Sequence, residues 1–453
     1  MADNGFGEYR PQQTPSRCSD CGLCREVCPF DGGSHNELAS GLFGRLSGVR
    51  STPETGFYLC AYMGGVCPDS LRYTRTSGGL ATWVLARLME TGAVDRVITV
   101  ASGPDPERLF DFAEFDSVTS LWNAARSSYY PVEISSGLRA VLRSDRRYAV
   151  IGLPCLVKGI RLAQRRAPRL MERIPVVLGL VCGQQRGKFF AEYLVRRAGL
   201  TGDRVRRISF REKRETQPAT LSHFAVWSDG ELPPRFVERS EGYGRAWGQS
   251  WFKQDACNYC DDVFAELADA AFMDAWLPVV QEDSRGTSIV LVRNPLCRKL
   301  LEDGIRSGGL QLQAIEIGEV IRSQQGCLRL KREGTALQLS LAGNTALEFQ
   351  PRVGPAPKWR FVARFRKAAE TRRMVASRAA MAAQVAAGPG LAVFYSELRK
   401  ATRYDDLALS FLGLLSLPQR AVRKLFRIIR EVIRGLMKAK NQPESPCPVP
   451  GKS

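Results

Sequence analysis

Short apolar runs alternate with helix-forming patterns between residues 71 and 215, and this alternation constrains the fold more than any other feature. The segments DRVITVA (95–101), YAVIG (148–152) and IPVVLGLV (174–181) have the length and composition of buried strands. Helix-like stretches follow the last two, at 157–166 and 187–198, and SIVLVR (288–293) is a further strand candidate. Strands that alternate with helices are typical of a parallel sheet covered by helices. We predict an α/β fold (α+β overall), with a central, mostly parallel sheet and flanking helices.

Composition excludes several classes of protein. Hydrophobic residues make up 44% and charged residues 25% of 453 residues, which is ordinary globular usage. No apolar run approaches the roughly 20 residues that a membrane-spanning helix needs. The polar N-terminus does not resemble a secretory signal, so we expect a cytoplasmic protein. In a reducing compartment, the 13 cysteines are better explained as metal ligands or redox groups than as disulfides.

The first cysteine cluster has the spacing of a ferredoxin-type iron–sulfur site. Cys18, Cys21 and Cys24 follow one another at intervals of three residues. Two residues compete to be the fourth ligand, since Cys28 completes the run before Pro29 and Cys67 precedes Pro68. In two-cluster ferredoxins the fourth cysteine of one run serves the other cluster, so Cys28 and the more distant Cys60 can also be spare. The alternative for this region is a zinc knuckle or inert thiols.

A second group of cysteines is distributed over three segments. Cys155 and Cys182 each follow a predicted strand, and ligands in open α/β sheets bind at the carboxyl ends of strands. Cys257 and Cys260 add a CxxC pair from a predicted loop. Four thiolates from these segments would hold a second cluster. The competing interpretation is that Cys155 and Cys182 are packing residues and that the CxxC pair is half of a zinc site.

The net charge of +19 is concentrated near the C-terminus. Residues 352–440 contain 20 Lys or Arg and 5 Asp or Glu, which gives 20 − 5 = +15. The segment QRAVRKLFRIIREVIRGLMKAK (419–440) places apolar residues on one helical face and arginines on the rest. Such a helix suits peripheral contact with an anionic membrane at its inner face, or docking on protein. Nucleic-acid binding is not expected, because no recognition motif accompanies the charge.

Composition divides the chain into four regions. Residues 1–70 are rich in Cys and Gly, residues 71–215 carry the strand–helix alternation, and residues 216–350 hold the CxxC pair. PRVGPAPKW (351–359) has three prolines and is expected to be a linker. We predict four parts: a ferredoxin-type 4Fe-4S region (1–70), an α/β region (71–215), a CxxC-containing region (216–350), and a basic helical extension with a disordered tail (351–453).

The order of these motifs resembles a known family. The motifs are RCSDCGLCREVCP (17–29), TSGGLATWVL (76–85), AVIGLPCLVKGIR (149–161), VLGLVCG (177–183), CNYCDDVFAELADAAFMDAW (257–276) and GTSIVLVR (286–293). Together they resemble the coenzyme F420 hydrogenase/dehydrogenase beta-subunit family of iron–sulfur flavoproteins. That family includes hydrogenase and formate dehydrogenase beta subunits and 7-hydroxymethyl chlorophyll a reductase. The resemblance covers residues 16–325.

The resemblance implies cofactors and roles for particular residues. It implies two 4Fe-4S clusters and FAD, with the α/β region binding the flavin. Cys18, Cys21 and Cys24 would bind the first cluster, and the second would be held near the flavin by Cys155, Cys182, Cys257 and Cys260. The turn Ser77, Gly78 and Gly79 would approach a flavin phosphate, and Asp269 and Asp274 would position the flavin or a substrate. Met273 and Leu156 depart from the family pattern.

The resemblance implies two possible functions, and the zinc interpretation of the cysteines gives a third. The first is a reductase or dehydrogenase that moves electrons between a ferredoxin or another redox protein, two 4Fe-4S clusters, FAD, and an organic substrate or coenzyme F420-like acceptor. Relatives that accompany surface-polysaccharide genes suggest a substrate of that kind. The second is a non-catalytic electron-transfer beta subunit that serves a partner subunit of a hydrogenase or formate dehydrogenase complex. The third is a zinc-bound structural or nucleic-acid-binding module. No catalytic residue is predicted.

Overall fold

The computed structural model describes residues 2–12, 14–103, 105, 108–124, 126–228, 233–342 and 351–415. The chain divides into two compact units, Met1–Lys400 and Ala401–Ser453, and each is considered by itself. The predicted amphipathic helix at 419–440 and the predicted disordered tail lie outside the described residues. Among the described residues, no helix is both long and apolar enough to cross a bilayer.

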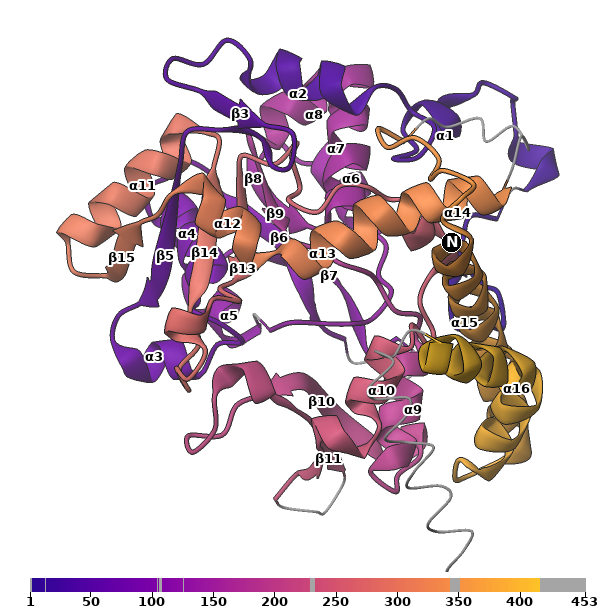
Figure 1. The fold of residues 1–453 in the computed structure, drawn as a ribbon. Helices are drawn as coiled ribbons and strands as arrows, with labels where there is room; N and C mark the ends of the chain where they lie inside the picture. Colours follow the sequence, from indigo (N-terminus) through magenta and orange to yellow (C-terminus); the bar gives the residue numbers. More distant parts are fainter. Residues whose placement is uncertain are drawn as a thin grey trace, which may run out of the picture. The chain divides into compact units, whose positions relative to one another are not determined.

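An eight-stranded sheet forms the centre of the first unit (Figure 1). Its order is β15 (Leu310–Ala314), β5 (Cys60–Val66), β14 (Ser288–Val292), β13 (Ala270–Asp274), β9 (Val176–Leu180), β8 (Tyr148–Gly152), β6 (Arg96–Ser102) and β7 (Phe110–Phe115). β13, β9, β8 and β6 are paired in parallel, and the other neighbours are antiparallel. Strand β5 therefore runs in the same direction as these four, and the prediction of a mostly parallel sheet is confirmed.

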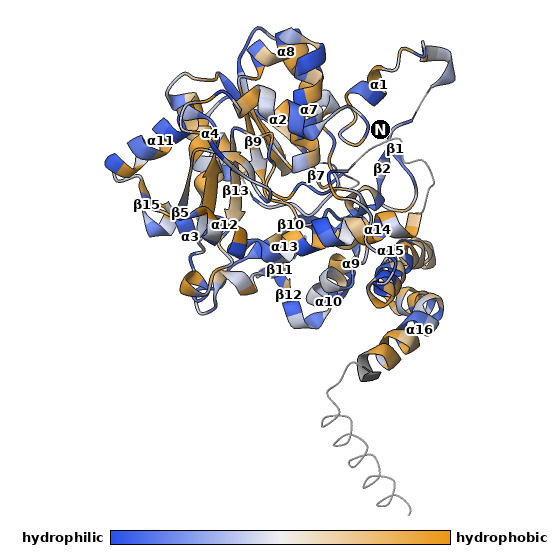
Figure 2. Cartoon of the chain, turned by 45° about the horizontal axis from the view of Figure 1, so that its top comes forward, coloured by the Kyte–Doolittle hydropathy of each residue, from blue (hydrophilic) through white to orange (hydrophobic). Residues whose placement is uncertain are grey.

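Helices cover both faces of this sheet because its strands are apolar on both sides. α4 (Leu80–Glu90), α5 (Val118–Ala124) and α11 (Pro295–Arg306) share one core with residues such as Ala149 and Ile151. α2 (His35–Phe43), α6 (Ser135–Arg143), α7 (Pro154–Arg166) and α8 (Pro168–Arg173) share another with Tyr148 and Val150. Successive residues of a strand point to opposite faces, so β8 contributes to both cores. The strands are accordingly apolar along most of their length (Figure 2).

A separate aromatic core lies around a small antiparallel sheet. This sheet consists of β10 (Val205–Glu212), β11 (His223–Ser228) and β12 (Arg235–Val237). α9 (Phe189–Arg197), α10 (Tyr243–Gly248) and α15 (Phe361–Ala387) contribute to the same core, in which Tyr193, Trp251 and Phe394 make edge-to-face contacts. The sequence predicted the helix at 187–198 and a basic helical extension after residue 351, but it did not predict this second sheet.

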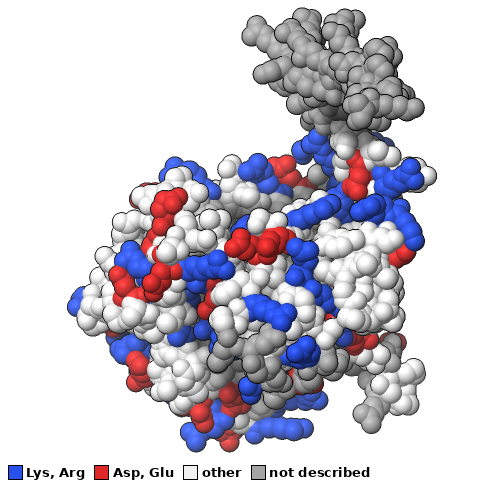
Figure 3. All heavy atoms as spheres, turned by 90° about the horizontal axis from the view of Figure 1, so that it is seen from below, with Lys and Arg blue, Asp and Glu red and all other residues white. Residues whose placement is uncertain are grey.

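The remaining strands and helices are short, apart from α16, which has 24 residues. They are β1 (Ala2–Asp3), β2 (Tyr9–Arg10), β3 (Arg50–Thr52), β4 (Gly56–Tyr58), α1 (Leu23–Glu26), α3 (Asp69–Tyr73), α12 (Ile317–Ser323), α13 (Gln325–Leu328), α14 (Gly334–Ala342) and α16 (Ala392–Leu415). A single π-helical segment, η7 (Arg329–Glu333), joins α13 to α14. Residues 351–359 contain no helix or strand and lie within the first unit. In Figure 3, basic and acidic side chains lie side by side over much of the face shown.

Candidate functional site

Two of the predicted cysteine ligands lie at the carboxyl ends of inner strands of the central sheet. Cys155 is in the first turn of α7, directly after β8, and Cys182 follows β9 by two residues. Because β8, β9 and β13 are parallel neighbours, their carboxyl ends lie at the same edge. β13 ends there with Asp274, another predicted site residue. This arrangement agrees with the general position of ligand sites in open α/β sheets.

The CxxC pair is held against the loop that follows β9. Cys257 lies in the 3₁₀ turn η5 (Asp255–Asn258), and its Sγ accepts a hydrogen bond of 3.3 Å from the amide of Gln185. The amide of Cys182 donates to the carbonyl of Val263 at 3.1 Å. These bonds connect the segments that carry Cys182, Cys257 and Cys260, although they are more than 70 residues apart in the sequence.

The four thiols form one electrostatic group. Burial raises the pKa of Cys155 to about 12, and Cys260 and Cys257 add to this shift. Burial likewise raises the pKa of Cys182, which also responds to the other three sulfurs. Burial favours the neutral thiol, whereas a bound metal requires the thiolate, so metal binding here would release protons.

The number of these cysteines bears on which metal centre they could hold. Among the described residues, no three His, Cys, Asp or Glu side chains are placed to hold one metal ion. A zinc ion needs its ligands within one tetrahedral shell. A cubane separates its ligands more widely, because each cysteine binds a different iron atom. Four cysteines are a ligand set that both 4Fe-4S clusters and structural zinc ions use.

Buried cations surround the sulfur group. Lys331, in η7, donates a 2.8 Å hydrogen bond to the Sγ of Cys260 and is 2% exposed. Burial alone would lower the pKa of Lys331, but thiolates at Cys260, Cys182 and Cys257 raise it above its ordinary value. Arg186 is fully buried and donates to the carbonyls of Trp251 and Trp247, and among negative charges that of Cys257 acts on it most strongly. Such a setting stabilises negatively charged sulfur.

The N-terminal cysteine run lies on α7, on the face of the sheet covered by α2, α6 and α8. Cys18, Cys21 and Cys24 are exposed and Cys28 is partly buried. Glu26 pairs with Arg166 of α7 at 3.2 Å, and the carbonyl oxygen of Val27 would lie 3.6 Å from a Cβ on Gly159 of the same helix. The turns before α1 use left-handed backbone at Asp20 (φ 52°) and Gly22 (φ 71°). Such tight turns direct neighbouring side chains to one side of a loop.

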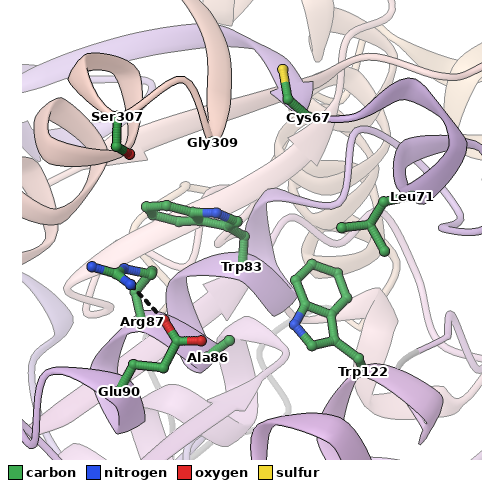
Figure 4. A pocket seen from close by; sticks show the side chains of 9 residues that line it. All are labelled: Cys67, Leu71, Trp83, Ala86, Arg87, Glu90, Trp122, Ser307 and Gly309. Atoms are coloured by element: carbon green, nitrogen blue, oxygen red, sulfur yellow. Dashed lines mark hydrogen bonds and ion pairs between the residues drawn. The ribbon is translucent and has the colours of Figure 1, made fainter.

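Cys67 lies on the opposite face of the sheet, in the α4 layer. It lines a cavity of about 410 Å³ together with Trp83 of α4, Trp122 of α5 and the Arg87–Glu90 ion pair (Figure 4). The cysteine run packs on α7, and α7 and α4 belong to different cores. This placement favours Cys28 over Cys67 as the fourth ligand of the first cluster.

A smaller cavity lies at the carboxyl ends of the parallel strands, on the same side of the molecule's central sheet as Cys155 and Cys182. Its lining includes Ser77, Arg211, Asp274, Trp276 and Thr287. Arg211 and Asp274 form a bidentate ion pair, with Nη1–Oδ2 and Nη2–Oδ1 distances of 2.8 and 3.2 Å. A guanidinium among hydroxyl groups is suited to recognise a phosphate or a polar ring edge.

A buried lysine supports the loops around this cavity. Lys213 donates to the carbonyls of Arg72 and Ser77 at 3.2 Å each, and to that of Arg285. Burial, reinforced by the positive charges of Arg211 and Arg72, lowers the pKa of Lys213 to about 7. The lysine therefore connects the glycine turn to the loop before β14.

The glycine turn has a packing explanation. The amide of Gly78 donates to the Oγ of Ser288 at 2.9 Å, and the Oγ of Ser77 donates to the carbonyl of Thr287 at 3.0 Å. A Cβ on Gly78 would lie 2.4 Å from the carbonyl oxygen of Gly64. Gly79 has φ 81° and begins α4 without a side-chain cap. The predicted phosphate contact would therefore rely on the first amides of α4, because the amide of Gly78 is already bonded.

The two predicted aspartates lie at opposite ends of the same strand, β13. Asp269 precedes β13, whereas Asp274 ends it. Asp269 accepts hydrogen bonds from Arg161 at 2.8 Å and from the amide of Val177 at 2.7 Å. These contacts tie α7 and β9 to β13. Only Asp274 lies at the edge that carries the thiols.

Sequence reasoning missed the residues that join the small cavity to the sulfur group. The carbonyl of Asp274 accepts a 2.8 Å hydrogen bond from Gln324. Cys327 follows in α13, and its Sγ would lie 3.2 Å from a Cβ on Gly183, next to Cys182. Lys331 lies one turn further along. No spacing rule marked this segment, because its role depends on contacts with residues far away in the chain.

The comparisons with known proteins agree with this architecture. The N-terminal model of the coenzyme F420 hydrogenase/dehydrogenase beta-subunit family matches residues 61–139, and the C-terminal model matches residues 145–317. Together they span more than half of the chain. No curated protein sequence matches.

Similar folds occur among solved structures. A chain from the F420-reducing [NiFe] hydrogenase complex of Methanosarcina barkeri, studied by xenon derivatization, is 16% identical with a TM-score of 0.50. The alignment covers 68% of this chain and 99% of that one. At this identity the likeness concerns the fold. The two family matches carry the assignment, and the chain belongs to the coenzyme F420 hydrogenase/dehydrogenase beta-subunit family.

Proposed function

We propose that this protein is an iron–sulfur flavoprotein that transfers electrons between a redox protein and a second substrate. Family membership indicates an oxidoreductase role in electron transfer. The observation that carries the finer proposal is the convergence of Cys155, Cys182, Cys257 and Cys260 beside the buried ammonium of Lys331. Buried cations that face thiols instead of carboxylates suit a negatively charged iron–sulfur cluster.

The residues have distinct roles in this proposal. Cys155, Cys182, Cys257 and Cys260 would bind one 4Fe-4S cluster, and Cys18, Cys21, Cys24 and Cys28 would bind another. Arg211, Asp274 and Trp276 would contact one edge of FAD at the mouth of the small cavity, which has a volume of about 20 Å³. When bound, clusters pass single electrons and a flavin can collect two, while the protein sets distance, potential and water access. The sulfur group and the cavity are linked through Gln324 and Cys327.

The exposed position of the first cysteine run supports a docking role. Cys18, Cys21 and Cys24 lie at the surface, where a ferredoxin or another redox protein could approach. The final acceptor in this proposal is an organic substrate or a coenzyme F420-like molecule. The similar chain of known structure comes from a hydrogenase complex, which favours a partner subunit as one source or destination of electrons.

Anaerobic purification with iron, labile sulfide and flavin analysis tests the proposal. The wild-type protein should contain all three, and Cys155→Ser and Cys260→Ser should each lose about half of the iron. Cys297→Ala is the matched control, because Cys297 is buried in the core under α11 and faces none of the four thiols. Its iron content should stay at the wild-type level. Zinc without sulfide, or unchanged iron in both serine variants, would contradict the second cluster.

A further inference from the structure

Lys331 differs from the other buried lysines in what it contacts. Lys253 and Lys367, at 1% and 4% exposure, both pair with the carboxylate of Glu370, at 3.2 and 3.3 Å. Lys331 is equally buried, yet the partner of its ammonium is the Sγ of Cys260 at 2.8 Å. Among the described residues, no carboxylate forms an ion pair with it.

A buried ammonium is stable only where negative charge compensates for lost hydration. Among the described residues, the hydrogen bond of the Lys331 ammonium goes to the Sγ of Cys260. The two buried carboxylates that follow Cys260 in the sequence are engaged elsewhere, since Asp262 accepts a hydrogen bond from the amide of Glu266 at 3.2 Å and Glu266 pairs with Arg352 at 2.7 Å. The negative charge that Lys331 needs must therefore come from sulfur.

The backbone at Lys331 supports a specific placement. The lysine lies in η7, a π-helical turn between α13 and α14. Single π turns occur often at functional sites, because the extra residue changes which side chains point inward. Arg332, the next residue, points elsewhere and donates to the carbonyls of Pro53 and Glu54. Within this turn, Lys331 contacts the sulfur group and Arg332 contacts the β3–β4 loop.

We propose that Lys331 is the counter-ion of the sulfur site formed by Cys155, Cys182, Cys257 and Cys260, and that its ammonium raises the reduction potential of the cluster held there. The inference rests on the proposed function. Reduction adds one electron, supplied by the partner redox protein, and one negative charge, and it neither forms nor breaks a bond. A fixed positive charge that donates a hydrogen bond to a ligand sulfur favours the reduced state, since net charge and such bonds set cluster potentials. Lys331 acts through Cys260 and is therefore a positioning residue.

The test is an anaerobic redox titration of the full chain, followed by electron paramagnetic resonance. Lys331→Met removes the charge, Lys331→Arg keeps it, and Lys299→Met changes an exposed lysine of α11 as the control. A Cys18→Ser variant identifies the signal of the first cysteine run. At a fixed potential, Lys331→Met should lower the ratio of reduced to oxidised second cluster about tenfold, which is about 59 mV for a one-electron couple. Lys331→Arg and Lys299→Met should stay close to wild type.

The outcomes separate this inference from the proposed function. A Lys331→Met protein that keeps its iron and its wild-type potential overturns the inference and leaves the proposed function intact. Loss of iron in Lys331→Met but not in Lys331→Arg supports it, because charge is what distinguishes the two variants. Equal loss of iron in both overturns it. Wild-type protein without iron and sulfide overturns the inference and the proposed function together.

Discussion

At the scale of single residues, buried charges connect distant parts of the first unit. Glu266 is 3% exposed and pairs with Arg352 at 2.7 Å, with Arg332 at 3.4 Å and with His35 at 3.7 Å. His35 begins α2, and Arg352 belongs to the proline-rich segment after α14. Glu266 therefore connects α2 and residues 351–359 to the segment that precedes β13. Removing a partner of a buried charge is far more costly than removing an exposed pair.

This network predicts a pH-dependent contribution to stability. Burial would raise the pKa of Glu266, but the neighbouring His35 and the paired guanidinium of Arg352 together lower it below its ordinary value. The stabilisation is therefore complete above the unfolded-state pKa of about 4.3 and is lost as pH falls below it. Arg352→Met should cost about 3 kcal/mol at pH 7, and the difference from wild type should shrink as pH falls from 5 towards 3. Urea unfolding at several pH values measures this.

The control is Arg298→Met, which removes an exposed pair with Glu302 on α11. That change should cost less than about 0.5 kcal/mol at any pH. A difference between wild type and Arg352→Met that stays constant from pH 7 to pH 3 would contradict the assigned role of Glu266.

At the scale of elements, close backbone contact explains the glycines that follow and precede α3. Gly64 and Gly65 precede the last residue of β5, Val66, and Gly78 lies in the turn before α4. A Cβ at Gly65 would lie 2.5 Å from the Nε of Arg72, and one at Gly78 would meet backbone atoms of β5 and β14. These elements approach one another more closely than any side chain allows.

Gly78→Ala should therefore destabilise the protein, by about 1–3 kcal/mol, because the atoms it meets are backbone atoms that cannot move aside. Gly41→Ala is the matched control. Gly41 lies inside α2, has ordinary helical backbone, and would place its Cβ in open space. That change should raise stability by about 0.5–1 kcal/mol. Thermal unfolding distinguishes the two, and equal unfolding temperatures would be inconsistent with the packing explanation.

At the scale of the whole molecule, the site belongs entirely to the unit formed by residues 1–400. All eight cysteines that we propose as ligands, together with Lys331, Arg211 and Asp274, lie within it. The positive charge of the chain has a different distribution, because much of it falls at 420–440, outside the described residues. Cofactor binding and surface attachment can therefore be separated experimentally.

Ending the chain after Lys400 should leave iron, sulfide and flavin content at the wild-type level. The same truncation should abolish flotation with vesicles that contain anionic phosphatidylserine, if the basic segment at 419–440 binds an anionic membrane as predicted. Vesicles of neutral phosphatidylcholine serve as the control. Flotation of the truncated protein, or of neither protein, would contradict the membrane prediction. Loss of iron on truncation would show that the second unit supports the site.

The sequence by itself determined the strands at 148–152 and 174–181, the helices that follow them, the long helix α15 and the cysteines at strand ends. These features are local, because periodicity and chain breaks are encoded within a few residues. The family resemblance also came from local motifs, and it is confirmed. The sequence did not reveal the antiparallel direction of β14 or the second sheet, since strand direction depends on which distant segments pair.

Only the tertiary structure decided which residues share a site. It placed Asp274 beside the thiols and Asp269 at the other edge of the same strand, although both matched one motif. It also brought Lys331 to Cys260 across 71 residues, a contact that no spacing pattern encodes. A buried charge takes whatever partner the fold places within reach. For that reason the counter-ion of the sulfur group could be identified from the structure and not from the sequence.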